Sequence, residues 1–317
     1  MAKPTANFVC TECGWSTPKW VGRCGECQAW DSMQEGAAGG GRGLGVAKQV
    51  RALKLVESSA AKPITDVSTQ SVSAWSTQVG EFDRVLGGGL VPGAVVLLSG
   101  EPGVGKSTLL LEVAANTAKS GKRVLYVTGE ESVGQVRLRA ERTGALTDNL
   151  YLAAETDLST VLGQIDAVGP ELLVVDSVQT IASSEIDGAA GMPSQIREVA
   201  ANLIRVAKER ALPVILVGHV TKDGSIAGPR ALEHLVDVVC HFEGDRQTSL
   251  RFVRSLKNRF GPTDEVGCFE MTGEGINQVT DPSGMFLSRG DAPVSGTCVT
   301  VTVEGKRPLI AEVQALV

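Results

Sequence analysis

The sequence lacks the features that mark a membrane protein, a secreted protein or a strongly basic one. No apolar run approaches the roughly 20 residues of a membrane-spanning helix, and the amino terminus has no apolar secretory segment. We therefore expect a cytoplasmic protein with no membrane partner. Positive charge is not in excess, since 30 Lys and Arg face 36 Asp and Glu, for a formal net charge of −6. This balance does not exclude nucleic acid as a partner, because binding depends on local patches.

The sequence does contain a phosphate-binding loop. Residues 100–107 read G-E-P-G-V-G-K-S, between an apolar run at 94–98 and a helix-compatible stretch at 108–119. In such loops backbone N–H groups surround the phosphates, the lysine reaches the β/γ oxygens and the serine hydroxyl binds Mg²⁺. A glycine-rich turn seldom matches this pattern in this context. We predict a nucleoside triphosphate and Mg²⁺ site built from Gly100, Glu101, Pro102, Gly103, Val104, Gly105, Lys106, Ser107 and Thr108.

Four of the seven cysteines form a pattern typical of a metal site. Cys10, Cys13, Cys24 and Cys27 are spaced C-x2-C-x10-C-x2-C. Two C-x-x-C pairs place four thiolates around one tetrahedral ion, and Zn²⁺ suits four sulfurs in a purely structural role. The alternatives are two disulfides, which a cytosolic protein disfavours, or a redox pair, which paired C-x-x-C motifs disfavour. The other three cysteines are expected in the core.

The remaining sequence predicts an α/β fold after a linker. Residues 36–45 hold six glycines, and residues 42–62 carry a net charge of +4. Such a stretch behaves as flexible coil, although its charge would also suit phosphate binding. Apolar strands then alternate with amphipathic helices, which indicates a mostly parallel sheet flanked by helices. We expect strands at 94–98, 123–128, 150–153, 172–176, 214–217, 236–242 and 250–256, and helices at 108–119, 132–142, 158–168 and 193–210.

Functional side chains should collect where parallel strands end. Asp176 follows four apolar residues, the arrangement in which a carboxylate holds Mg²⁺ through water. Glu130 and Glu131 follow another strand, where a carboxylate can polarise an attacking water, although Glu131 would also suit a helix amino terminus. His219 ends a further strand and is expected either to sense the γ-phosphate or to serve a structural role.

Together these motifs resemble one known family. The stretch 87–108, the K-N-R-F-G motif at 257–261 and the amino-terminal cysteine element are similar to the bacterial RadA (Sms) DNA repair proteins, within the RecA superfamily. The resemblance covers nearly the whole chain. It implies a RecA-like P-loop ATPase core and an ATP-driven protein that promotes branch migration of recombination intermediates. The absence of an N-K-x-D motif also favours ATP over GTP.

The resemblance assigns further roles residue by residue. It implies that Glu130 activates water and that His219 links the γ-phosphate to DNA-binding loops. Lys257 and Arg259 would enter the ATP site of a neighbouring subunit, where an arginine finger stabilises transition-state charge. Taken alone, K-N-R-F-G could also be an ordinary solvated turn.

The same resemblance places two loops against DNA, at 183–194 and 220–230. Both are glycine-rich and expected to be unstructured without a ligand, and only Lys222 and Arg230 are basic there. This sparse charge suggests a ring that combines several subunits. The implied partners are single-stranded and branched DNA, further copies of the chain in a hexameric ring, and a RecA recombinase. The alternatives are an ATP-switched DNA-binding protein without motor activity, and a regulatory ATPase that does not act on DNA.

The expected domains are a zinc element at 1–35, a linker at 36–66, the ATPase at 67–275 and a connector at 276–317. The family carries a carboxy-terminal domain that resembles the Lon protease fold, with a structural role. Residues 297–303 and 309–317 read as its first strands. We expect the sequence to stop just inside that domain, with an unpaired apolar edge and a poorly ordered tail after about residue 290.

Overall fold

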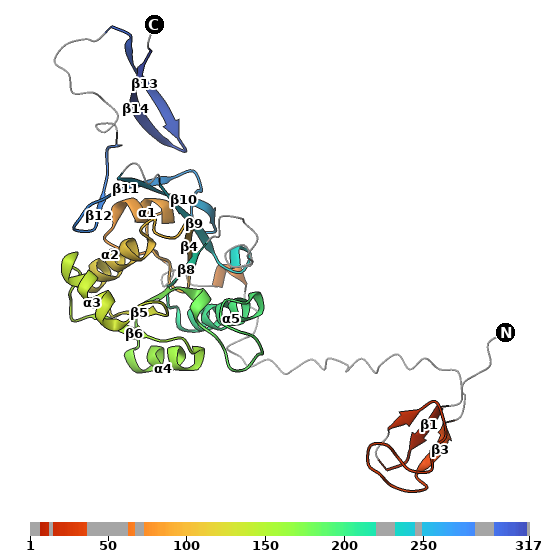
Figure 1. The fold of residues 1–317 in the computed structure, drawn as a ribbon. Helices are drawn as coiled ribbons and strands as arrows, with labels where there is room; N and C mark the ends of the chain where they lie inside the picture. Colours follow the sequence, from red (N-terminus) through yellow and green to blue (C-terminus); the bar gives the residue numbers. More distant parts are fainter. Residues whose placement is uncertain are drawn as a thin grey trace. The chain divides into compact units, whose positions relative to one another are not determined.

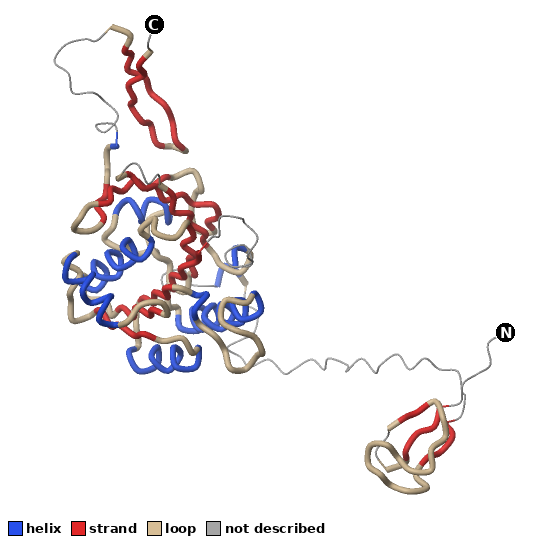
Figure 2. The backbone as a smooth tube through the Cα atoms, in the orientation of Figure 1, coloured by secondary structure: helices blue, strands red, loops and turns tan. Residues whose placement is uncertain are grey.

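The computed structural model describes residues 7–12, 15–36, 63–66, 73–219, 232–244, 249–282 and 295–315. The chain divides into two compact units, residues 1–67 and 68–317. Figures 1 and 2 show their strands and helices. Among the described residues, no helix combines the length and the apolar character needed to cross a membrane.

The first unit is a small three-stranded sheet. Strand β1 (Asn7–Cys10) lies between β2 (Ser16–Thr17) and β3 (Met33–Gly36) and pairs antiparallel with both. Its core consists of Cys10, Cys24 and Met33, with Phe8 and Trp15 packed against them. So small a core gives little hydrophobic stabilisation, and a bound ion can supply the remainder. A separate 3-10 turn, η2, covers Ile64–Asp66.

The second unit is built on a nine-stranded sheet with the order β12-β11-β10-β9-β4-β8-β7-β5-β6 (Figure 1). Its strands are β4 (Val95–Gly100), β5 (Val124–Thr128), β6 (Leu150–Ala154), β7 (Leu172–Asp176), β8 (Val214–His219), β9 (Val238–Glu243), β10 (Leu250–Asn258), β11 (Val266–Met271) and β12 (Ile276–Gln278). Strands β9, β4, β8, β7, β5 and β6 pair in parallel. The hairpins from β9 to β12 are antiparallel.

Helices cover both faces of this sheet. They are α1 (Gly80–Leu86), α2 (Lys106–Lys119), α3 (Val133–Arg142), α4 (Leu158–Val168) and α5 (Pro193–Arg210), with a 3-10 turn η3 (Val178–Thr180). Side chains of α1 and α2 pack with alternate strand residues such as Val96 and Leu98 on one face. Side chains of α4 and α5 pack with Val95 and Leu97 on the other. Strands β4, β5 and β7 are buried on both sides, as parallel strands must be between two helical layers. The predicted α/β fold is confirmed.

The carboxy-terminal segment forms a hairpin where we expected a poorly ordered tail. Strands β13 (Thr297–Glu304) and β14 (Arg307–Gln314) pair antiparallel along their whole lengths. Gly305 has φ of +60° and reverses the chain between them. The two apolar runs pair with each other on one side only, and among the described residues the outer edge of each strand has no strand partner, so the expected unpaired apolar edge remains.

Candidate active site

The phosphate-binding loop lies between β4 and α2, as the sequence predicted. Gly100 has φ of +157°, and a Cβ atom there would lie 2.2 Å from the carbonyl oxygen of Phe242. Gly103 and Gly105 have φ of +80° and +113°. Only glycine adopts these conformations without strain. The loop backbone therefore turns toward the amino terminus of α2, which carries the positive end of the helix dipole.

Lys106 lies inside this loop. Its side chain is 3% exposed, and Nζ donates to the carbonyl oxygens of Gly100 at 2.9 Å and Glu101 at 2.8 Å. Burial lowers the pKa of Lys106, while the charges of Asp176 and Glu130 oppose that shift. The lysine thus lies in the field of both strand-end carboxylates. Ser107 and Thr108 follow it in the first turn of α2 and are half-buried.

Asp176 ends β7 next to the loop and is held by a tyrosine. Its Oδ2 accepts a hydrogen bond from Tyr126 Oη at 2.7 Å. Burial, and secondarily the Asp176 charge, raises the pKa of Tyr126 well above its ordinary value, so the phenol stays a donor. The other carboxylate oxygen, Oδ1, accepts no hydrogen bond from the described residues. It is therefore available to a hydrated cation.

Glu130 lies at the centre of a second cluster at the same edge of the sheet. Its Oε1 accepts from Ser177 Oγ at 2.5 Å and from His219 Nε2 at 2.9 Å. These three residues follow or end β5, β7 and β8, so three neighbouring strands converge on one carboxylate oxygen. The Nδ1 atom of His219 is buried and has no hydrogen-bond partner among the described residues. The arrangement brings together a carboxylate and an imidazole, two groups able to hold a water molecule or sense a phosphate.

In the first unit, three of the four predicted metal ligands converge. The Sγ atoms of Cys10, Cys24 and Cys27 all lie within 4.8 Å of one another, and those of Cys10 and Cys27 are 3.7 Å apart. Four sulfurs bound tetrahedrally at about 2.3 Å from Zn²⁺ would be about 3.8 Å apart. The cluster therefore fits a zinc-sized ion. Cys13 lies outside the described residues.

Comparison with known proteins assigns both units. Residues 68–225 match the AAA domain family, and residues 8–35 match the rubredoxin metal binding domain. The chain is 56% identical to the DNA repair protein RadA of Mycolicibacterium smegmatis over 100% of this chain and 68% of that protein. It is 54% identical to RadA of Mycobacterium tuberculosis and 45% identical to RadA of Bacillus subtilis, covering 65% and 69% of those proteins. The chain belongs to the RadA family of DNA repair proteins.

The family resemblance inferred from the motifs is thereby confirmed. The chain spans about two thirds of the length of these RadA relatives. Its second unit is a P-loop ATPase domain with a mostly parallel sheet, and its first unit is a zinc-ribbon element.

Within this RadA-family chain, the two adjacent glutamates have different surroundings. Glu130 faces Ser177 and His219, whereas Glu131 forms an ion pair with Arg139 of α3. Ser132 caps the amino terminus of α3 in a capping box with Gln135, so Glu131 directly precedes the helix that carries its partner Arg139. Of the two glutamates, Glu130 is therefore the one that contacts the residues at the ends of β7 and β8, a distinction that sequence alone left open.

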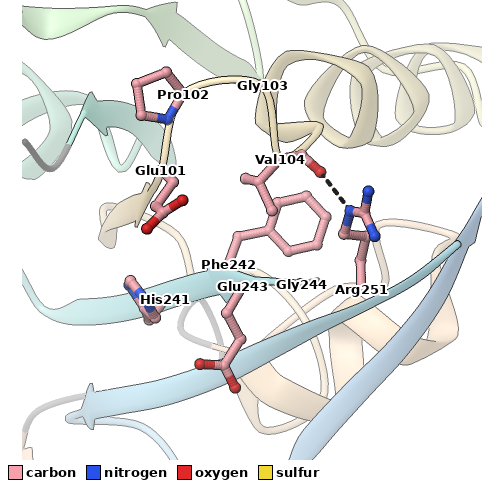
Figure 3. Close-up of a pocket in the computed structure, with 9 residues that line it drawn as sticks. All are labelled: Glu101, Pro102, Gly103, Val104, His241, Phe242, Glu243, Gly244 and Arg251. Atoms are coloured by element: carbon pink, nitrogen blue, oxygen red, sulfur yellow. Dashed lines mark hydrogen bonds between the residues drawn. The ribbon is translucent and has the colours of Figure 1, made fainter. Parts of the chain in front are cut away.

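A pocket of about 240 Å³ adjoins the phosphate-binding loop on the side of β9 (Figure 3). Loop residues 101–104 form one wall, and residues 241–244 with Arg251 form the other. Arg251 Nε donates to the carbonyl oxygen of Val104 at 3.2 Å, which ties the loop to β10. The pocket is large enough for part of a nucleotide next to its phosphates.

Lys257 and Arg259 lie near the amino-terminal ends of the parallel strands, whereas the phosphate-binding loop lies at their carboxyl ends. Asn258 pairs with Val238, which pairs with Val96 near the beginning of β4, whereas the loop begins at Gly100. Val96 and Gly100 are four residues apart along β4, which corresponds to about 13 Å along the strand. Lys257 Nζ donates to the carbonyl oxygens of Glu233 at 2.8 Å and Val236 at 2.7 Å. Arg259 is 57% exposed, and its Nη1 lies 3.6 Å from Asp237 Oδ1.

The first predicted DNA loop is not unstructured, which corrects that expectation. The Gln195 side chain accepts from Ser183 N at 2.8 Å and donates to the carbonyl oxygens of Ser183, Ile186 and Gly188 at 3.0, 2.9 and 3.1 Å. One buried amide thus replaces the ladder bonds that the glycine-rich segment lacks. Lys222 and Arg230, in the second loop, lie outside the described residues.

Sequence reasoning missed three residues at these sites. Ser177 follows the strand-end aspartate directly, so its place in the sequence was a usable signal. Tyr126 falls within an apolar strand, and nothing in its spacing separates it from a core residue. Asp237 accepts from Val95 N at 3.0 Å and from Lys208 Nζ at 2.5 Å, and only the folded sheet brings these groups together.

Proposed function

We propose that the protein hydrolyses ATP. The observation that carries this proposal is the convergence of Lys106, Asp176, Glu130 and His219 at one edge of the sheet, beside a phosphate-binding loop. Hydrolysis of a phosphoanhydride mainly requires positioned charge and an oriented water. The AAA domain match over residues 68–225 supports the same conclusion.

ATP and Mg²⁺ fit the residues present. The loop N–H groups, Lys106 and the amino terminus of α2 would hold the phosphates, and residues 101–104 would cover them. Ser107 and Asp176 offer the hydroxyl and the carboxylate that Mg²⁺ prefers, and Tyr126 orients that carboxylate. The ion would neutralise charge on the phosphate oxygens when bound.

Glu130 is the group we assign to the attacking water. Ser177 and His219 hold its Oε1, which leaves Oε2 to accept the water proton. His219 directly precedes residue 220, where the second DNA loop begins. A change in that loop would therefore be transmitted to Glu130 through a single hydrogen bond.

We further propose that DNA stimulates this hydrolysis and that the protein drives branch migration. Support comes from the names of the RadA relatives, which are DNA repair proteins, and from the position of His219. Single-stranded and branched DNA would contact residues 183–194 and 220–230, with Lys222 and Arg230 supplying positive charge. A RecA recombinase is a further proposed partner. The competing possibility is an ATP-switched DNA binder, in which hydrolysis does not depend on DNA.

Lys257 and Arg259 are proposed to act on a neighbouring copy of the chain. Their position about 13 Å along the sheet from the loop of the same chain supports this. Head-to-tail contacts between copies would bring the Arg259 edge of one to the loop edge of the next, as in a hexameric ring. Arg259 would then stabilise transition-state charge in trans.

For the first unit we propose one structural Zn²⁺ bound by Cys10, Cys13, Cys24 and Cys27. The fit of three sulfur positions to a tetrahedral ion supports it. Four thiolates leave no open coordination position, so this ion performs no catalysis.

The ATP assignment is tested by Lys106→Ala. We expect turnover to fall by at least about 100-fold, because the substitution removes the positive charge that stabilises the developing transition state. Lys119→Ala is the matched control, since Lys119 ends the same helix and donates to the exposed-loop carbonyl oxygen of Gly144, away from the phosphate-binding loop. Undiminished turnover of Lys106→Ala would overturn the assignment.

A further inference from the structure

One side chain of the carboxy-terminal hairpin is buried against α1 and the nine-stranded sheet of the same unit. Arg307, the first residue of β14, is 7% exposed, whereas Val299, Val301 and Val303 of β13 are 60%, 62% and 62% exposed. The turn before Arg307 also packs closely, because a Cβ atom on Gly305 would lie 2.1 Å from the Asp264 carbonyl oxygen. The hairpin therefore contacts the rest of the second unit through its turn and through this guanidinium.

The guanidinium of Arg307 makes four hydrogen bonds there. Nη1 donates to Glu81 Oε2 and to the Val266 carbonyl oxygen at 3.2 Å. Nη2 donates to the carbonyl oxygens of Val279, at 2.9 Å, and Thr280. Glu81 is itself 2% exposed and also accepts from Cys268 N at 2.9 Å. Such a buried charged pair is costly to break, because removal of Arg307 would leave exposed Arg84, whose Nε lies 3.6 Å from Glu81 Oε1, as the remaining cationic partner of Glu81 among the described residues.

Glu81 belongs to α1, whose other end holds the K-N-R-F-G segment. Asn258 Nδ2 donates to the carbonyl oxygens of Leu86 at 3.1 Å and Val85 at 3.4 Å, the last residues of α1. Asn258 Oδ1 accepts from Phe260 N at 2.8 Å. These bonds fix the backbone on both sides of Arg259.

A close backbone contact strengthens this link. A Cβ atom on Gly261 would lie 2.9 Å from Gly87 Cα, and Gly87 follows α1 directly. Neither glycine has room for a side chain. A shift of α1 must therefore move residues 258–261 with it.

We propose that Arg307 is a positioning residue for the neighbour's ATP site. By anchoring Glu81 it fixes α1, and α1 fixes Arg259, so the carboxy-terminal hairpin sets the geometry of a group that acts on another subunit. This inference rests on the proposed action of Arg259 in trans. It predicts that loss of Arg307 impairs catalysis in the neighbour and spares nucleotide binding in its own subunit.

The test is steady-state ATP hydrolysis by the full chain carrying Arg307→Gln. We expect kcat to fall about 100-fold, as for a misplaced catalytic group, with KM for ATP and nucleotide binding within about twofold of the parent. Addition of Lys106→Ala subunits, whose Arg259 is correctly held, should restore turnover. Lys306→Gln is the matched control, because Lys306 occupies the same turn and its ion pair among the described residues is with exposed Asp264. An unchanged kcat for Arg307→Gln, or a loss of nucleotide binding that mixing does not rescue, would overturn the proposal.

A second variant separates positioning from instability. Glu81→Gln with Arg307→Met removes both charges and leaves an oxygen to accept from Cys268 N. We expect it to melt near the parent temperature, yet to show the same rescuable loss of kcat. Full turnover in this variant would mean that the pair acts through stability alone. If Arg259→Ala is itself not rescued by mixing, the action in trans fails; if it is rescued and Arg307→Gln is not, only the present inference fails.

Discussion

Two adjacent carboxylates at the end of β5 show how local structure separates chemical roles. Glu130 Oε1 is held by Ser177 and His219 at the edge of the sheet that carries the phosphate-binding loop. Glu131 is neutralised by Arg139 and stabilises α3. Since the two side chains have the same chemistry, their positions alone make one a candidate base and the other a structural group.

This difference predicts that the same substitution impairs turnover at Glu130 and spares it at Glu131. Glu130→Gln should lower kcat by roughly 10²–10⁴-fold, because the amide cannot take the proton from water, while ATP still binds. Glu131→Gln is the matched control and should retain turnover. Steady-state hydrolysis together with equilibrium nucleotide binding provides the measurement. Equal losses in both variants would contradict the assignment of Glu130.

At the scale of elements, apolar runs predicted the sheet well. Helix 158–168, strand 172–176 and helix 193–210 have the boundaries expected from sequence. Burial on both faces explains this, because a parallel strand between helical layers must be apolar throughout. The expectation that functional side chains collect at the carboxyl ends of parallel strands also placed Glu130, Asp176 and His219 together.

Long-range side-chain contacts were beyond the sequence. Gln195 orders the loop at 183–188 through hydrogen bonds that no local pattern encodes. Arg307 and Glu81 are 226 positions apart and meet only in the folded unit. Such contacts depend on topology, whereas propensity and periodicity describe neighbours along the chain.

The zinc-ribbon element should depend on its metal. Cys10→Ser should lose the bound zinc and unfold the first unit, because its core is too small to persist without an ion. ATP binding by the second unit should be unaffected. Zinc content by atomic absorption, with Cys298→Ser as the matched control, tests this. Retention of one zinc per chain by Cys10→Ser would refute the site.

Chelation offers an independent measurement on the unmodified chain. At pH 8 a thiol reagent should label the ribbon cysteines only after zinc is removed. Cys240 and Cys268 should stay unlabelled throughout, since burial raises the pKa of their thiols to about 12 and about 11. Both thiols therefore remain protonated at the pH of the labelling experiment. Labelling of the ribbon at full rate before chelation would argue against a bound metal.

At the scale of the whole molecule, the groups that we propose to act in ATP hydrolysis lie at two opposite ends of the sheet. The loop, Asp176 and Glu130 lie at one edge, and Arg259 lies at the other. One copy of the chain cannot close this distance. Two copies placed head to tail could, so the proposed action of Arg259 in trans predicts that full activity requires assembly.

Mixing of defective subunits tests that requirement. Arg259→Ala should reduce turnover by roughly 10³-fold, the contribution typical of an arginine finger. Lys106→Ala subunits are inactive in their own sites, yet they carry an intact Arg259. A mixture of the two variants should recover turnover, whereas each alone should not. If no mixing ratio gives recovery, Arg259 does not act in trans.

The central claim, a DNA-dependent ATPase, is tested most directly by ATP hydrolysis with and without single-stranded DNA across a salt series. The Glu130→Gln variant sets the background rate. The account predicts stimulation by DNA that fades as salt rises, because phosphate contacts release counterions. Turnover that DNA does not change at any salt concentration, with no DNA binding, would contradict it.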